Sequence, residues 1–355
     1  MILLKNFLNL PTPSSINYVW NFGSLLGLRL AIQIFTGVFL SFHYEARSDQ
    51  AFDKVLTFCN EVEYGWLIRF LHSSGASVFF IMCYCHIGKA LVYQSYFLIK
   101  VWASGLLIFF TLIGSAFLGY VLPWGQISFW GATVITNLIS VIPYVGERVV
   151  RWLWGGFNVN SATLNRFFSF HFILPFLVRG LVIIHIIFLH ESGSSNPVGV
   201  RINLDKISFF NYFVIKDLVT VVLILTILIV FSVHFPFTLI DHENFIEANP
   251  ILTPPHIQPE WYFLFAYAIL RSIPNKLGGV VFLVFSIGII LILPFLSSYK
   301  VKGRRFQPLK RLLFWFHTGT VIILTWLGRM PVEAPFVRLG KLYTVVYFIF
   351  YFIYP

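Results

Sequence analysis

The sequence predicts an all-α polytopic membrane protein with eight transmembrane helices, the first four of which form a bundle. Hydrophobic residues make up 58% of the 355 residues and charged residues only 11%, a composition typical of membrane proteins. Apolar runs long enough to cross a bilayer recur along the chain. The basic residues behind the net charge of +11 lie mostly in the short loops between these runs, so they indicate topology and not nucleic-acid binding.

Length and periodicity place the individual helices. The predicted spans cover residues 22–44, 65–93, 101–121, 167–190, 218–236, 278–296, 311–328 and 336–354. Residues 45–64 form an acidic loop, and the apolar pieces 127–142 and 149–157 are too short to cross, which predicts small interfacial helices. We expect two regions, an N-terminal bundle over residues 1–200 and a C-terminal region over 201–355.

The longest predicted connection, residues 237–275, is rich in aromatic residues and contains five prolines. Long connections inside a compact domain are usually functional or disordered, and the stiffness of this one favours a functional loop. Orientation follows from another connection, the acid-free run that precedes and enters the seventh span. Such a run stays on the side of synthesis, which places both termini on that side; its basic residues are Lys300, Lys302, Arg304, Arg305, Lys310 and Arg311.

Two pairs of histidines dominate the apolar segments. His72 and His86 share the second span, His171 and His185 share the fourth, and both intervals are 14 residues. On an α-helix that interval returns a side chain to within about 40° of the same face, roughly 21 Å further along the axis. Two such helices can clamp two stacked cofactors, whereas a single buried histidine would more often be a hydrogen-bonded packing residue.

Four glycines repeat the same interval. Gly23 and Gly37 lie in the first span and Gly105 and Gly119 in the third. Glycine allows a flat ring to approach a helix backbone closely, so these positions suit a macrocycle. The three cysteines form no CxxCH motif, and any haem would therefore be bound non-covalently.

Chain direction determines which histidines meet. The second and fourth spans run the same way, so His72 pairs with His171 on the outer side and His86 pairs with His185 on the inner side. Two imidazoles close both axial positions of a haem iron, and closed coordination suits electron transfer rather than oxygen binding.

With these features the chain resembles mitochondrial cytochrome b, the haem subunit of ubiquinol:cytochrome c oxidoreductase (complex III). Besides the histidines, the resemblance rests on four short motifs: Asn21 to Gly27 (NFGSLLG), Gly119 to Gln126 (GYVLPWGQ), Ser128 to Thr133 (SFWGAT) and Pro259 to Tyr262 (PEWY). It covers almost the whole chain.

The resemblance implies a quinone cycle with two non-covalent b haems and two quinone sites. At the outer site ubiquinol gives one electron to a Rieske iron–sulfur protein and the other to the outer haem; at the inner site quinone is reduced. It also implies cytochrome c1 and other complex III subunits as partners, a homodimer, and the mitochondrial inner membrane with both termini on the matrix side. The N-terminus carries no recognisable presequence, which predicts insertion where the chain is made.

The outer site is expected between the 124–166 segment and the long connection. Glu260 stands alone among aromatic residues, and desolvation should raise its pKa into the range of a general base, although an ordinary loop acid is the alternative. Tyr262 belongs to the same motif. The expected pocket lining is Tyr120, Phe129, Gly131 and Tyr267, although aromatic residues of this kind are more often core.

The inner site is expected where His190, Lys216, Asp217 and Ser24 meet. A histidine and an aspartate can donate hydrogen bonds and protons to a quinone's two carbonyls. Helix capping and charge anchoring are the alternative for Asp217.

Two cations lie one turn from a predicted ligand. Arg69 precedes His72 and Lys89 follows His86, positions from which they could meet the propionates of the outer and inner haem. Both could instead snorkel to the interface. The family usually has arginine where this chain has Lys89, and lysine cannot form the same bidentate contact.

Two other function classes remain open from the sequence. A two-haem cytochrome that only relays electrons would need the histidine pairs but not the residues from Pro259 to Tyr262. A transporter could use buried histidines without any haem.

Overall fold

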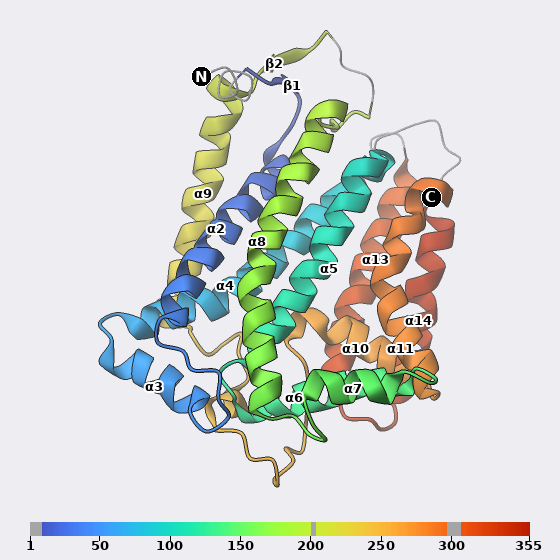
Figure 1. Ribbon diagram of the computed structural model, residues 1–355. Coiled ribbons are helices and arrows are strands. Elements are labelled where there is room, and N and C mark those ends of the chain that lie inside the picture. Colours follow the sequence, from blue (N-terminus) through green and yellow to red (C-terminus); the bar gives the residue numbers. More distant parts are fainter. Residues whose placement is uncertain (1–8, 200–203, 297–306) are drawn as a thin grey trace.

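A computed structural model describes residues 9–199, 204–296 and 307–355. Eight helices in this part of the chain are long and apolar enough to cross a membrane, as the sequence predicts. Figure 1 shows most of them as one bundle of long helices, with short helices α3, α6 and α7 across one end.

The first four spans form the N-terminal half of the bundle. They are α2 (Phe22–Ser41, continuing the 3-10 turn η1, Tyr18–Asn21), α4 (Gly65–Val92), α5 (Ile99–Val121) and α8 (Ser161–Ser192). Helix α2 packs on α4, and α5 packs on α8. Only 6% of the most apolar stretch of α8 is buried, so its outer face suits lipid rather than water.

Helix α8 begins six residues earlier than predicted, at Ser161 instead of residue 167. The polar residues at its start form a capping box and not a loop. The side chain of Asn160 accepts a hydrogen bond from the backbone N–H of Ala162 (2.8 Å), and the hydroxyl oxygen of Thr163 accepts one from the backbone N–H of Asn160 (3.1 Å). Such a cap satisfies backbone donors that have no partner inside the helix.

The C-terminal half contains the remaining four spans. Helix α9 (Phe209–His234) begins nine residues before the predicted 218, because a polar pair inside it, Lys216 and Asp217, does not stop the helix. The others are α11 (Lys276–Gly288, continued by η6, Ile289–Ile292, and α12, Leu293–Leu296), α13 (Pro308–Arg329) and α14 (Phe336–Ile353). The short helix α10 (Leu264–Ser272) packs against α11, α13 and α14.

The connections contain more helix than predicted. The expected interfacial helices are present as α6 (Gln126–Asn137, with η3, Leu138–Val141) and α7 (Gly146–Trp154). The acidic connection was predicted as a loop, and that prediction is wrong, because residues Ala51–Glu61 form α3. Its apolar face buries Ala51 and Phe58, which explains why a charged segment becomes ordered.

A small sheet, also not predicted, joins the N-terminal lead to the start of α9. Strand β1 (Pro11–Pro13) pairs antiparallel with β2 (Lys206–Ser208), with Thr12 opposite Ile207. The hydroxyl of Ser14 donates to the Asp205 carboxylate at 2.7 Å beside it. The pairing fixes the two segments that lead into α2 and α9.

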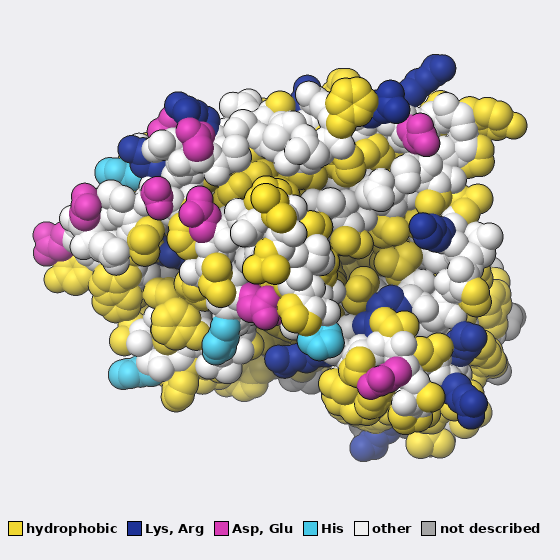
Figure 2. Space-filling view, turned by 90° about the horizontal axis from the view of Figure 1, so that it is seen from below, with side chains coloured by type: hydrophobic (Ala, Val, Ile, Leu, Met, Phe, Trp, Pro, Cys, Tyr) yellow, Lys and Arg dark blue, Asp and Glu magenta, His cyan; other side chains and the backbone are white. Residues whose placement is uncertain are grey.

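The two ends of the molecule differ in what they contain. Strand β1, near the first described residues, and the C-terminus lie toward one end, and α3, α6 and α7 lie at the other, as predicted (Figure 1). Figure 2 views that second end, where acidic side chains gather on the side of α3 and basic ones are more numerous on the side of α7. The basic residues Lys300, Lys302, Arg304 and Arg305, which set the predicted orientation, lie outside the described residues.

Candidate functional site

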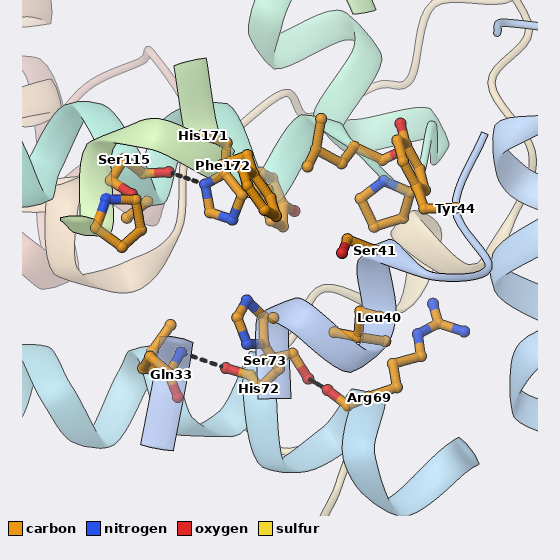
Figure 3. Close-up of a pocket in the computed structure, with 18 of the residues that line it drawn as sticks. Gln33, Leu40, Ser41, Tyr44, Arg69, His72, Ser73, Ser115, His171 and Phe172 are labelled. Carbon is orange, nitrogen blue, oxygen red and sulfur yellow. Dashed lines mark hydrogen bonds between the residues drawn. The ribbon is translucent and has the colours of Figure 1, made fainter. Parts of the chain in front are cut away.

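The outer histidine pair faces across the gap between α4 and α8. The ring centroids of His72 and His171 are 6.2 Å apart, and Figure 3 shows the two side chains pointing toward each other. An imidazole nitrogen binds a metal at about 2.0–2.1 Å, so two imidazoles on opposite sides of one metal have ring centroids about 6 Å apart. The observed separation fits bis-imidazole ligation.

Each of the four predicted glycines lies against one of the four histidines. A Cβ added at Gly37 would lie 3.0 Å from Cε1 of His72, and one at Gly119 would overlap the ring of His171. Near the inner histidines, a Cβ at Gly23 would lie 3.5 Å from Cε1 of His86. A Cβ at Gly105 would lie 3.1 Å from Cε1 of His185. The glycines therefore leave room for the rings at the places where larger residues would displace them: Gly23, Gly37, Gly105 and Gly119.

Hydrogen bonds at Nδ1 orient the two outer rings. The Nδ1 atom of His171 lies 2.8 Å from the carbonyl oxygen of Ser115, which can only accept, so this nitrogen carries the proton. The Nδ1 atom of His72 lies 2.9 Å from Oγ1 of Thr36, whose own hydroxyl donates to the Ile32 carbonyl. Both rings therefore present Nε2 as the unprotonated nitrogen, the form that binds a metal.

The inner pair repeats part of this arrangement. The Nδ1 atom of His185 lies 2.9 Å from Oγ of Ser104, whose hydroxyl donates to the Lys100 carbonyl. His86 lies within electrostatic range of His185 and Lys89. The structure thus brings together the same residues that the topology pairs.

Each histidine pair offers two imidazoles to a cofactor between α4 and α8. Within residues 9–199, 204–296 and 307–355, no group of three or more His, Cys, Asp or Glu side chains gathers as a metal site. A haem between the helices would be held by one histidine of α4 and one of α8, with a glycine next to each ring. A haem fits this donor set.

A cavity of about 260 Å³ surrounds the outer histidines. Arg69 lines it, and its guanidinium lies 5.1 Å from the Phe245 ring centroid and donates to Cys59 Sγ at 3.5 Å. Figure 3 shows Arg69 and Tyr44 toward the same end of the cavity. Arg69 thus lines the same cavity as His72 and His171, and its role at a haem propionate stays a prediction.

The Pro259 to Tyr262 motif is docked on α4. The Trp261 indole donates to Ser77 Oγ at 3.0 Å, and the Tyr262 ring stacks on Phe80 with centroids 4.1 Å apart. The Tyr84 hydroxyl also donates to the carbonyl of Tyr262. These contacts hold the loop at the outer cavity, and Glu260 and Tyr262 belong to its lining.

Glu260 is half-buried and lies near a second carboxylate, that of Asp241. Desolvation of its carboxyl and, less strongly, the negative charge of Asp241 together raise the pKa of Glu260 to about 8. Asp241 accepts a hydrogen bond from Gln258 at 3.0 Å. Tyr120, also in the cavity lining, lies within electrostatic range of both carboxylates. A carboxyl with this pKa can exchange a proton near neutral pH.

Three predicted lining residues lie away from that cavity. Phe129 is buried in a hydrophobic cluster with Trp124. Tyr267 packs under the guanidinium of Arg271, and a Cβ at Gly131 would meet open space. Their assignment to a quinol pocket stays a prediction.

On the opposite side, three of the four predicted inner-site residues come together. Asp217 lies within electrostatic range of Lys216 and close to Ser24, whose hydroxyl donates to the carbonyl of Asn21 at 2.9 Å. The Lys216 ammonium donates to the carbonyl of Ile16 at 2.8 Å. His190 lies near the end of α8 and is half-buried. A contact between His190 and the other three stays a prediction.

Lys89 contacts an aromatic ring. Its ammonium lies 4.4 Å from the ring centroid of Trp20, whose indole donates to the carbonyl of Ser195 at 2.9 Å. Trp20 therefore links Lys89 to the segment after α8. This aromatic partner was not predicted.

Sequence reasoning also missed the residues that hold the histidine rings. Thr36 and Ser104 each directly precede one of the repeated glycines, Gly37 and Gly105, so a hydroxyl followed by glycine was the available signal. Gln33, which donates to the backbone carbonyl of His72 at 2.9 Å, had no such signal.

Comparisons with known proteins agree with this geometry. Residues 7–193 match the family model described as cytochrome b/b6/petB, and residues 247–348 match the model for the C-terminal part, cytochrome b(C-terminal)/b6/petD. A solved structure described as "Hyperthermophilic respiratory Complex III" is 33% identical, with a TM-score of 0.92 over 99% of this chain and 93% of that one. With the family models covering most of its length and the fold shared almost completely, this chain belongs to the cytochrome b family.

Proposed function

We propose that the chain is the cytochrome b subunit of a ubiquinol:cytochrome c oxidoreductase, which oxidises ubiquinol at an outer site and reduces quinone at an inner site. One observation carries this proposal: Glu260 and Tyr262 line the same cavity as His72 and His171. A protein that only relays electrons would need the histidines but no proton acceptor beside them.

The histidines are proposed to hold two non-covalent b haems, one between His72 and His171 and one between His86 and His185. When bound, these haems supply one-electron carriers at two depths of the membrane. The chain itself orients the histidine rings. Hydrogen bonds at Nδ1 of His72, His171 and His185 direct Nε2 of each ring toward the ligand position.

At the outer site, Glu260 is proposed to accept a proton from the quinol hydroxyl. Oxidising a quinol to a quinone removes two protons and two electrons, so a base near neutral pKa assists the step. Tyr120 and Tyr262 line the same cavity as this carboxyl. Phe129, Gly131 and Tyr267 are proposed, with Tyr120, as lining of the quinol pocket.

At the inner site, Asp217 and His190 are proposed to donate hydrogen bonds and protons to the quinone oxygens. Reducing a quinone to a quinol consumes two protons, and these two side chains can supply them. Ser24 and Lys216 lie near Asp217 and are proposed to belong to the same site. Arg69 and Lys89 are proposed to neutralise the haem propionates.

The proposed partner subunits and dimer rest on membership of the cytochrome b family. We propose a Rieske iron–sulfur protein, cytochrome c1 and other complex III subunits as partners, with the complex as a homodimer in the mitochondrial inner membrane and both termini on the matrix side. The similarity to a chain of a respiratory complex III supports this, as does the location of β1 and the C-terminus toward one end of the bundle. We also propose residues 1–200 as the haem-binding region and 201–355 as the region that completes the quinol site.

The test uses membranes that contain the assembled complex. Reduced-minus-oxidised spectra should show two b components of unequal potential, and quinol should reduce cytochrome c only when both are present. Two b components without quinol:cytochrome c turnover would favour a simple relay. Absence of any b band would exclude both the oxidoreductase and the simple electron relay.

A further inference from the structure

Arg29 is the residue whose environment the proposed function does not explain. It lies inside α2 with no exposed surface. Its Nη2 donates to Oε1 of Gln33 at 3.0 Å, but Nε and Nη1 are buried and have no hydrogen-bond partner within the described ranges. Burying a charged group without full pairing is strongly unfavourable, so such a residue in a membrane span indicates function.

The guanidinium also lies beyond reach of the membrane surface. Arg29 is 11 residues from the start of the first span at Tyr18 and 12 from its end at Ser41. At 1.5 Å per residue these distances are about 16–18 Å, much longer than an arginine side chain. Snorkelling is therefore excluded, and the ion pairs formed by the described residues do not include Arg29.

The position along α4 places this charge next to the outer histidine. A Cβ added at Gly75 would overlap Nη2 of Arg29 and Oε1 of Gln33, so the guanidinium lies directly against α4 at Gly75. Gly75 is three residues past His72 and eleven before His86. Arg29 thus lies between the two histidine levels and closer to the outer one.

Gln33 connects the same charge to the outer ligand. Its side-chain oxygen accepts from Arg29, and its Nε2 donates to the backbone carbonyl of His72 at 2.9 Å. Arg29 also acts electrostatically on His72. The charge is therefore coupled to the outer ligand both through space and through one side chain.

We propose that Arg29 is a fixed positive charge that raises the reduction potential at the His72–His171 level and so holds an electron there more tightly. The inference rests on the proposed function, because it requires a haem iron between those two histidines. Reduction adds one electron, taken from quinol, and forms or breaks no bond. A nearby cation in a region of low dielectric stabilises the more negative, reduced state.

The test is a redox titration of both b components in membranes with the assembled complex, followed optically and by electron paramagnetic resonance. Arg29→Met keeps an unbranched side chain of similar length but removes the charge. We expect the outer component to become at least tenfold less reduced at a fixed ambient potential, which is 59 mV for a one-electron couple. The inner component should shift less, and Arg29→Lys should stay near the wild type.

Two controls separate charge from position. Arg179→Met removes an exposed arginine of α8 and should change neither potential. Gln33→Met breaks the link to His72 but leaves the charge, so it should produce only a small part of the shift. If Gln33→Met shifted the outer potential as far as Arg29→Met, the position of His72 and not the charge would set the potential, and the proposal would be wrong.

The outcomes distinguish this proposal from the function on which it rests. Two b components with unchanged potentials in Arg29→Met would overturn the role of Arg29 and leave the proposed function intact. A wild-type complex without b components would overturn the proposed function itself. Arg29→Gln, a second neutral variant, provides the same comparison if Arg29→Met does not assemble.

Discussion

The ring of Tyr262 lies flat on the ring of Phe80, with centroids 4.1 Å apart and planes within 4°. Stacked aromatic pairs contribute about 0.5–1.5 kcal/mol beyond their buried area. Phe80 lies on α4 between His72 and His86, so this contact joins the long connection to the helix that carries one histidine of each pair. Glu260, two residues before Tyr262, is thereby held at the outer cavity.

Loosening this docking should impair quinol oxidation without changing the haem spectrum. Trp261→Phe removes the hydrogen bond to Ser77, worth about 1 kcal/mol. We expect quinol:cytochrome c turnover at low quinol to fall about fivefold, as measured in steady-state assays at matched haem content. Trp326→Phe, on an exposed position of α13, is the control. Wild-type turnover in Trp261→Phe would mean that other contacts suffice to hold the loop.

Glu260→Gln keeps the shape of the side chain but cannot accept a proton. Quinol oxidation should slow by about 10²-fold or less, the lower end of general-base assistance, because water or His256 can replace part of it. The haem spectrum should not change, since Glu260 lies on the loop and none of the four predicted ligands is altered. Steady-state turnover in membranes gives the measurement.

The pH dependence of the same reaction has a defined sign. The pKa of Glu260 is raised to about 8, so below that pH the carboxyl is mostly protonated and cannot act as a base. Turnover of the wild type should therefore rise as pH approaches 8, and Glu260→Gln should lose this rise. An unchanged pH profile in the variant would remove Glu260 from the mechanism.

The glycine contacts predict that one glycine-to-alanine substitution, which adds a single methyl group, removes one haem. A Cβ at Gly119 would overlap the ring of His171, whereas a Cβ at Gly114 on the same helix meets open space. Gly119→Ala should remove or displace the outer b component, although alanine favours the helix itself. Gly114→Ala should leave both components unchanged. Haem content and the reduced-minus-oxidised spectrum provide the readout.

Each histidine level should lose its haem separately. His185→Leu should abolish the inner b component and leave some of the outer one, and His72→Leu should do the reverse. The reason is that His72 faces His171, 6.2 Å away, whereas His185 belongs to the inner level. Loss of the same component in both variants would contradict this pairing.

Asp217→Asn and His190→Leu should slow electron exit. Both remove a proton donor from the proposed quinone-reducing site, so reoxidation of the b haems should slow more than their reduction. Stopped-flow traces separate the two phases, and Asp53→Asn on the exposed face of α3 is the control. Slowed reduction with normal reoxidation would place these residues outside the exit site.

The sequence by itself determined the eight spans and the small helices of the 124–166 segment. It also determined which histidines pair, His72 with His171 and His86 with His185. These features depend on local properties. A sufficiently long apolar run by itself predicts a membrane-spanning helix. A 14-residue interval on an α-helix returns a side chain to nearly the same face. The four repeated glycines could be singled out for the same reason, but the histidine that each one contacts comes from the structure.

Only the tertiary structure decided what those local patterns leave open. The helical state of α3 depends on burying Phe58, and β1 needs a partner strand almost 200 residues later. Whether an aromatic residue lines a cavity, as Tyr120 does, or fills a core, as Phe129 does, depends on neighbours from distant segments. The contact of Arg29 with Gln33 and α4 is of the same kind: the charge is visible in the sequence, but its burial arises only when two helices pack together.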